Sequence, residues 1–371
     1  MFRELHLFAK FLYILLFPVL VLLSLLYSLI TSFRNLLFDL GVKKPKVLDG
    51  KVVSIGNLDI GGTGKTPVTI RVGEYLLSQG YSVSVLTRGY RSGLGSDEGI
   101  WIKDGSIHPL SGLEGRKLSE IYPDEPRLIS LSLAGCWVVV GANRVRMADL
   151  FLKQTGVKID WWILDDGFQH RGIHRDVDMV LIDSKRSVSS WCIPVGRSRE
   201  NVRGLRRASV FLFTRASSNK LSLKNKKITD RFSKPSYSVE FKTNKFLLVD
   251  RLEDRFSTKE VDVSFFKGKK ISVVSAISKN DLFVEEVARV LGISKNDFFY
   301  SFFLRDHSRF NASLGLDTRK LDETDLVITT GKDYFRDPSF FRGLQASTVI
   351  LSLEVVLSDS QISKILVKKE G

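Results

Sequence analysis

The hydrophobic pattern begins with one long apolar segment. Residues 11–33, FLYILLFPVLVLLSLLYSLITSF, contain no charged side chain, and about twenty apolar residues suffice to cross the hydrocarbon of a bilayer. The segment is apolar on every face, unlike the helix of a soluble core, and is longer than the apolar core of a cleaved signal peptide. We predict a membrane anchor helix in residues 1–40. Pro18 can kink it, so a spanning helix and a helix lying in one leaflet both stay open.

Short apolar strands alternate with amphipathic helices after this segment. Residues 51–57, KVVSIGN, have the β-branched run of a buried strand, and residues 66–80 predict a helix that ends near Gly80. Further strands are predicted within 160–170 and 176–183. This alternation predicts an α/β fold with a parallel sheet that helices cover on both faces.

The second half repeats the alternation after a polar stretch at residues 216–236. Residues 237–250 alternate like a pair of linker strands, and a strand, a helix and a short strand are predicted at 269–277, 280–292 and 325–330. We therefore expect a second, smaller α/β domain. The predicted organisation is an anchor helix at 1–40, a nucleotide-binding domain at 41–235, a β-strand linker at 236–250 and a C-terminal α/β domain at 251–371.

A glycine-rich loop joins the first strand to the first helix of the alternating region. In GNLDIGGTGKTP, residues 56–67, glycines allow backbone N–H groups to turn toward an anion, a lysine supplies a positive charge, and a threonine hydroxyl can bind Mg²⁺. Asp59 stands where the usual phosphate-binding (P-loop) pattern has its first glycine. The pattern predicts a P-loop NTPase-like domain that binds a nucleotide through Gly61, Gly62, Thr63, Gly64, Lys65 and Thr66.

Two adjacent carboxylates follow the strand predicted within residues 160–170. Asp165 and Asp166 would stand at the carboxyl end of that strand, where it meets the phosphate loop. One of them, with Thr66, can hold Mg²⁺ directly or through water, although a turn built on D-D-G has the same composition. We expect Gln169, His170 and Arg171, which follow, to line the nucleotide or acceptor cleft.

Composition narrows the partners of this chain. Its 371 residues carry a formal charge of +15, which favours negatively charged partners such as anionic lipids or phosphorylated substrates. The basic residues are scattered without the motifs of nucleic-acid readers, so we expect no nucleic acid. The basic residues after the anchor outnumber those before it, which favours an orientation with the soluble part in the cytoplasm, where ATP is available. The five arginines at 197–207 could bind the phosphate of a substrate or of lipid headgroups, or could lie on the solvent-exposed face of a helix.

Several motifs occur in one order and together resemble the tetraacyldisaccharide 4'-kinase family of lipid A biosynthesis. They are the phosphate loop, TRGY at 87–90, DEP at 124–126, LDDGFQHRGIHRD at 164–176, IPVGRSRE at 193–200, RDHSRF at 305–310 and TTGKD at 329–333. The resemblance implies ATP- and Mg²⁺-dependent phosphorylation of the 4'-hydroxyl of a tetraacyl glucosamine disaccharide 1-phosphate. It also implies a location at the cytoplasmic face of the inner membrane, where the anchor meets a lipid acceptor.

The resemblance further implies catalytic roles for two residues beside Lys65. Asp124 would take the proton of the attacking hydroxyl with the help of His307. The sequence departs from the family pattern at Pro123, Ser308 and Gly331. Pro123 and Ser308 are the neighbours of Asp124 and His307, and Gly331 lies in the TTGKD motif near the C-terminus, where it affects a contact of that motif. A membrane-anchored ATPase or GTPase switch without a lipid acceptor, and a nucleotide sensor without turnover, remain alternatives with the same loop.

Overall fold

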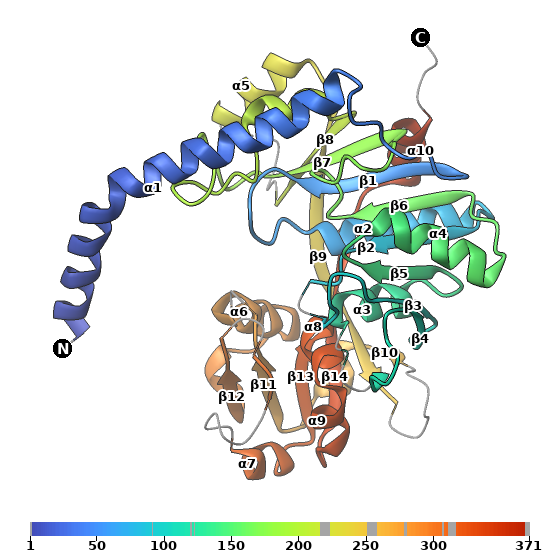
Figure 1. Ribbon diagram of the computed structural model, residues 1–371. Helices are drawn as coiled ribbons and strands as arrows, with labels where there is room; N and C mark the ends of the chain where they lie inside the picture. Colours follow the sequence, from blue (N-terminus) through green and yellow to red (C-terminus); the bar gives the residue numbers. More distant parts are fainter. Residues whose placement is uncertain are drawn as a thin grey trace. The chain divides into compact units, whose positions relative to one another are not determined.

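A computed structural model gives the architecture of the chain (Figure 1). It describes residues 2–90, 92–118, 121, 123–215, 223–250, 258–277, 280–305, 308–310 and 317–367. The chain forms two compact units, one from residues 1–83, 158–240 and 357–371, the other from 84–157 and 241–356. The domain boundaries expected from the sequence are drawn differently and stay a prediction.

The first unit holds a parallel sheet. Its strands lie in the order β6 (Trp161–Asp165), β1 (Lys51–Asn57), β7 (Val177–Asp183), β8 (Val210–Thr214) and the start of β9 (Ser236–Val249), and every neighbouring pair is parallel. Because carboxyl ends of parallel strands meet at one edge, the residues that follow β1, β6, β7 and β8 share one side of the sheet.

Helices and a small aromatic core complete the first unit. Helix α2 (Lys65–Ser78) packs on β1 and β6, and α10 (Asp359–Leu366) packs on α2. The other helical segments in the described part of this unit are α1 (Phe2–Asp39), the 3-10 helix η2 (Val202–Arg207) and α5 (Leu223–Phe232). Buried Phe168, Phe211 and Phe213 pack with aliphatic side chains on the sheet. The strands and the helix expected around the phosphate loop are confirmed.

The second unit holds two groups of strands. In one, β2 (Val83–Thr87), β5 (Trp137–Gly141), β3 (Gly99–Lys103) and β4 (Ser106–Ser111) are neighbours in that order, with β3 antiparallel to both β5 and β4. In the other, β12 (Tyr300–Phe303), β11 (Ile271–Ser275), β13 (Leu326–Thr330) and β14 (Ser347–Val356) are all parallel. The end of β9 pairs antiparallel with β10 (Thr258–Val261).

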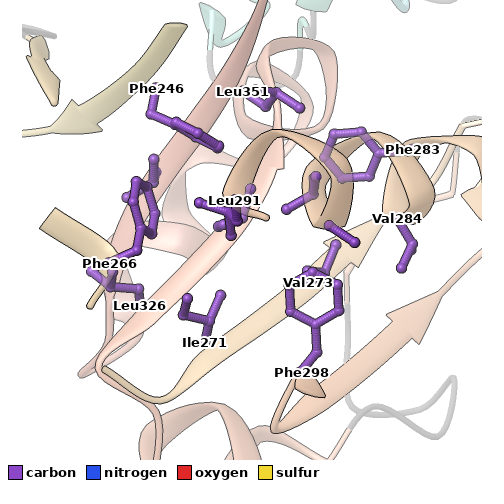
Figure 2. Packing of buried hydrophobic residues seen from close by; sticks show 14 residues of the cluster. Phe246, Phe266, Ile271, Val273, Phe283, Val284, Leu291, Phe298, Leu326 and Leu351 are labelled. Carbon is purple, nitrogen blue, oxygen red and sulfur yellow. The ribbon is translucent and has the colours of Figure 1, made fainter. Parts of the chain in front are cut away.

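The second unit also contains several short helices. They are α3 (Asp124–Ser132), α4 (Arg144–Thr155), α6 (Asn280–Leu291), α7 (Thr318–Asp322), α8 (Gly331–Arg336) and α9 (Pro338–Gly343), with 3-10 helices η3 (Val263–Phe266) and η4 (Lys295–Asp297). Of these, α3, α4, α6 and α8 pack on the strands of the unit. Figure 2 shows one buried core cluster of this unit, to which Phe246, Phe266, Phe283 and Val273 belong. Burial of each such side chain contributes roughly 1.5–3 kcal/mol.

The α/β fold class is therefore confirmed, including the parallel sheet and the apolar N-terminal helix. Residues 237–250 are expected as a pair of strands, but 237–249 belong to the single strand β9. Residues Leu15–Asp39 of α1 are long and apolar enough to cross a membrane. Cys136 and Cys192 are buried and not linked to each other.

Candidate functional site

The phosphate loop has the backbone of an anion cradle. Gly61 has φ +119° and Gly64, the N-cap residue of α2, has φ +87°, a region that side-chain-bearing residues rarely adopt. A Cβ added to Gly61 or Gly62 would meet no atom within 4 Å, so the space over the loop is open. The Thr63 hydroxyl is buried and finds no partner among the described residues. An anion at the start of α2 would meet these free donors and the positive end of the helix.

Asp59 anchors this loop. Its carboxylate accepts hydrogen bonds from the Ser198 hydroxyl (2.8 Å) and the Ser189 backbone N–H (3.2 Å) and lies 3.5 Å from the Arg197 guanidinium. The Ile60 N–H donates to the Arg197 carbonyl at 2.8 Å. The departure from the usual glycine thus has a structural reason, because the loop is tied through this side chain to the segment 189–198.

Lys65 and the two carboxylates meet at the carboxyl ends of β1 and β6. The Lys65 ammonium lies 3.3 Å from Asn57 Oδ1 and 3.5 Å from Asp166 Oδ1. Asp166, at φ +48°, also binds the Arg199 guanidinium through both oxygens, at 2.6 and 2.7 Å. Asp165 is buried and accepts a hydrogen bond from the Thr69 hydroxyl at 3.0 Å. The structure therefore brings Lys65 and Asp166 together.

Carboxylate and hydroxyl oxygens are the ligands that Mg²⁺ prefers, and this corner offers Asp165, Asp166 and the buried Thr66. Asp166 is about one-third exposed, and two cations occupy its oxygens. Asp165 is held by Thr69, one turn further along α2 than Thr66. The donor set fits a divalent cation, which Thr66, Asp165 and Asp166 would hold.

The residues after the two carboxylates contact two different parts of the first unit, the phosphate loop and helix α1. The Gln169 amide donates to the Asn57 carbonyl at 2.9 Å and to Glu200 at 3.2 Å, so Gln169 lies beside the phosphate loop. His170 follows and is partly buried. Arg171 points elsewhere: it donates to the Asn35 carbonyl at 2.8 Å and pairs with Asp39 at 2.9 Å. In this structure Arg171 therefore holds the end of α1.

Two residues at this edge, Asp183 and Arg215, were not predicted from the sequence as site residues. Arg215, at the end of β8, pairs with Asp183 at 2.8 Å and donates to the carbonyl of Gly62 at 3.0 Å. Asp183, the last residue of β7, lines a pocket with Gly61 and Gly62. The strand pattern of the sequence could have predicted both residues. Because β7 and β8 continue the parallel sheet, the residues at their carboxyl ends must lie near the phosphate loop.

The arginines at 197–207 are mostly engaged within the protein. Arg197, Arg199 and Arg206 pair with Asp59, Asp166 and Asp39 respectively, and Arg207 pairs with Glu200 at 2.8 Å. Only residues Val202–Arg207 are helical, as a 3-10 helix. These contacts make four of the five arginines part of the scaffold that shapes the site.

Helix α1 docks through a seam of polar side chains. Ser24 donates to the Cys192 carbonyl at 2.7 Å, Tyr27 to the Arg199 carbonyl at 2.9 Å, and Asn35 to the buried Glu200 carboxylate at 2.6 Å. Other faces expose large apolar side chains, including those of Leu22, Leu25, Leu26, Leu29, Ile30 and Phe33. The seam ties α1 to the segment that also contacts the phosphate loop.

Asp124 lies in the second unit, as the first residue of α3 after Pro123. It is 8% exposed, and burial raises its pKa above the ordinary value, with the nearby Glu125 carboxylate acting in the same direction. Arg336 Nε lies 3.4 Å from Asp124 Oδ2 and lowers this pKa in part, as does the charge of Lys332. An aspartate with a raised pKa is a better proton acceptor near neutral pH.

The other residues of the C-terminal motifs surround Arg336. His307 lies outside the described residues, but the carbonyl of the next residue, Ser308, accepts a hydrogen bond from Arg336 at 3.3 Å. At Gly331, a Cβ would lie 3.1 Å from the Leu128 side chain, so any larger residue there would require a small shift of that side chain.

Comparison with known proteins agrees with the motifs. The profile of the family described as tetraacyldisaccharide-1-P 4'-kinase matches residues 16–370. The tetraacyldisaccharide 4'-kinase of Bdellovibrio bacteriovorus is 32% identical over 355 residues, covering 91% of this chain and 94% of that protein. The enzyme of the same name from Desulfatibacillum aliphaticivorans is 31% identical, covering 93% and 90%.

A solved structure agrees with these sequence relatives. The crystal structure of LpxK from Aquifex aeolicus in complex with ATP aligns with a TM-score of 0.70 and 27% identity, over 96% of this chain and 99% of that one. Profile, relatives and fold cover nearly the whole length of the chain. It belongs to the tetraacyldisaccharide-1-P 4'-kinase family.

Proposed function

We propose that this protein transfers the γ-phosphate of ATP to the 4'-hydroxyl of a tetraacyl glucosamine disaccharide 1-phosphate. The observation that carries the proposal is the open anion cradle at Gly61–Gly64 with Lys65 beside it, in a chain of this kinase family. The product is the disaccharide bisphosphate, and ADP leaves.

The nucleotide is held by the residues of the phosphate loop. The backbone N–H groups of the loop and the free Thr63 hydroxyl bind phosphate oxygens. When nucleotide binds, the Lys65 ammonium leaves its ion pair with Asp166 and contacts the phosphates instead. There it neutralises the negative charge that develops during transfer. Thr66 with Asp165, Asp166 or both would hold Mg²⁺, which neutralises phosphate charge when bound.

Asp124 is the proton acceptor of the transfer. The acceptor's 4'-oxygen bonds to the γ-phosphorus, the bond from that phosphorus to the β-γ bridging oxygen breaks, and the hydroxyl proton moves to the Asp124 carboxylate. His307 orients that carboxylate. Arg336 contacts Asp124 and the Ser308 carbonyl, and so links the two motifs. Gln169 and His170 contribute to binding of nucleotide or acceptor.

Helix α1 keeps the enzyme at the cytoplasmic face of the inner membrane. Its polar seam, Ser24, Tyr27 and Asn35, is used by the protein itself, and its other faces are apolar. The exposed Lys43, Lys44 and Lys46 follow the helix and attract anionic headgroups. We therefore favour a helix whose second half lies against the protein and in one leaflet, which presents the site to a lipid acceptor.

Transfer of label from ATP to lipid tests the function. Detergent-solubilised protein is incubated with Mg²⁺, γ-labelled ATP and tetraacyldisaccharide 1-phosphate, and label is followed into the lipid fraction. Lys65→Ala should reduce transfer by about 10²–10³-fold, while the exposed Lys153→Ala, on α4, should leave it unchanged. Free phosphate without labelled lipid, from folded protein, would favour the ATPase or GTPase switch instead.

A further inference from the structure

The second unit contains a pocket that borders Asp124 through Arg336 but has no assigned part in binding ATP or the acceptor hydroxyl. It has a volume of about 650 Å³ and is lined by α3 residues, by the α8–α9 region and by apolar side chains around β4. Its charged lining residues, within the described part of the chain, are Arg127, Arg336 and Arg342. A pocket with this lining selects anions.

Arg336 contributes hydrogen-bond donors to this pocket. Only 7% of the residue is exposed, and its Nη1 and Nε contact the Asp333 carboxylate at 2.9 Å and the Asp124 carboxylate at 3.4 Å. The Nη2 group is buried and has no partner in the described structure. Asp124 and Asp333 balance the charge of this arginine, but its Nη2 donors stay unsatisfied, and a buried donor without a partner is costly.

Arg127 and Arg342 bring positive charge without a matching carboxylate. Arg127 is partly buried, its Nε has no partner among the described residues, and no described ion pair involves either arginine. Burial, and then the charge of Arg342, lower the pKa of Arg127. Two guanidinium groups that repel each other and retain free N–H groups are typical of a site that an anion completes.

We propose that this pocket is a second anion site, distinct from the phosphate loop, that binds a phosphomonoester group through Arg127, Arg336 and Arg342. A phosphomonoester offers three terminal oxygens, and the planar forks of arginine bind such oxygens in pairs. The group can belong to a soluble compound or to a lipid headgroup.

Binding of inorganic phosphate tests the soluble source. The full-length Lys65→Ala protein in detergent is saturated with ADP and titrated with inorganic phosphate in a calorimeter. The variant and the bound ADP prevent phosphate binding at the phosphate loop from contributing to the measured heat. The double variant Arg127→Gln/Arg342→Gln in this background should bind phosphate at least tenfold more weakly. Arg319→Gln, an exposed arginine of α7 in the same unit, should bind like its parent.

Thermal unfolding shows whether the double variant is intact. Without phosphate its Tm should equal or exceed that of the parent, because a repulsion between like charges has been removed. Phosphate should raise the Tm of the parent and of Arg319→Gln but not that of the double variant, since only a ligand that binds the folded state stabilises it.

Vesicle flotation tests the lipid source. The same proteins are mixed with phosphatidylcholine vesicles with or without phosphatidic acid, whose headgroup is a phosphomonoester. Loss of the phosphatidic acid dependence in the double variant alone would assign the site to a lipid headgroup, and loss of phosphate binding alone would assign it to a soluble compound. Unchanged binding in both experiments would overturn the proposal.

Discussion

At the scale of residues, the site depends on side chains whose partners are distant in sequence. Asp59 replaces a common glycine and bonds to Ser189 and Ser198, more than a hundred residues away. Burial raises the pKa of Asp124, and the contact with Arg336 opposes that rise in part. In both cases residue type alone predicted less than the contacts show, because tertiary neighbours set the role of each carboxylate.

Asp59→Gly should destabilise the protein, although it restores the common loop pattern. The variant leaves the Ser189 N–H without its side-chain acceptor and removes one of the two acceptors of the Ser198 hydroxyl, which keeps the Ser189 carbonyl at 2.9 Å. Loss of these contacts costs about 1–3 kcal/mol of unfolding free energy. Urea unfolding measures this change. Ser198→Ala is the matched variant: if the contact matters, the two changes together should cost less than their sum. Strict additivity would show that Asp59 does not act through Ser198.

Asp124→Asn should reduce phosphate transfer by about 10²–10⁴-fold, the usual contribution of a general base. Nucleotide binding should change little, because the phosphate loop lies in the other unit. Transfer assays and ADP titrations of the same preparation separate the two effects. Equal losses in both would make Asp124 a structural residue.

Arg336→Gln should move the acid limb of kcat/KM to higher pH. A base is active only when deprotonated, and the positive Arg336 lowers the raised pKa of Asp124; without that charge the carboxylate protonates at a higher pH as the solution is acidified. Lys332→Gln should give a smaller shift in the same direction, since Lys332 acts more weakly than Arg336 and Glu125 opposes both. An unchanged profile in Arg336→Gln would contradict the contact.

At the scale of elements, α1 is both an apolar helix and a docked one. Its apolar composition predicted the membrane anchor, but only the structure shows that Ser24, Tyr27 and Asn35 form one polar seam. The seam continues into Glu200, which also binds Arg207 and Gln169. The anchor therefore reaches the phosphate loop through a short chain of hydrogen bonds.

Asn35→Ala should weaken this docking. Glu200 is fully buried and would lose one donor, which costs about 1–3 kcal/mol. The exposed Ser32→Ala on the same helix should be neutral. Denaturant unfolding in detergent compares the two. If both variants match the wild type, the seam adds no stability and α1 is free to leave the protein.

At the scale of the whole molecule, each compact unit carries one buried thiol. Cys192 belongs to the first unit and Cys136 to the second. Burial raises the pKa of both, that of Cys136 to about 12, so neither thiol should react in the folded protein near neutral pH. Their reaction with a thiol reagent therefore reports the opening of each unit separately.

ATP added with EDTA should protect Cys192 more than Cys136. Nucleotide at the phosphate loop stabilises the first unit, by about 2.7 kcal/mol at a hundredfold excess over Kd, which slows opening-limited labelling about 100-fold. Mass spectrometry after timed labelling in mild denaturant measures both rates. Equal protection would mean that the two units open together, and Lys65→Ala should remove the protection at either thiol.

The sequence by itself determined the strand, loop and helix of the phosphate site, the alternating α/β order and the apolar anchor. These features are local, because glycine conformation, hydrophobic period and segment length depend on neighbours in the chain. The anchoring of the loop by Asp59, the pairing of Asp183 with Arg215, the seam of α1 and the arginine pocket were decided only by the tertiary structure. Each joins residues far apart in sequence, and their partners follow from how the sheet and its helices pack, which no local pattern specifies.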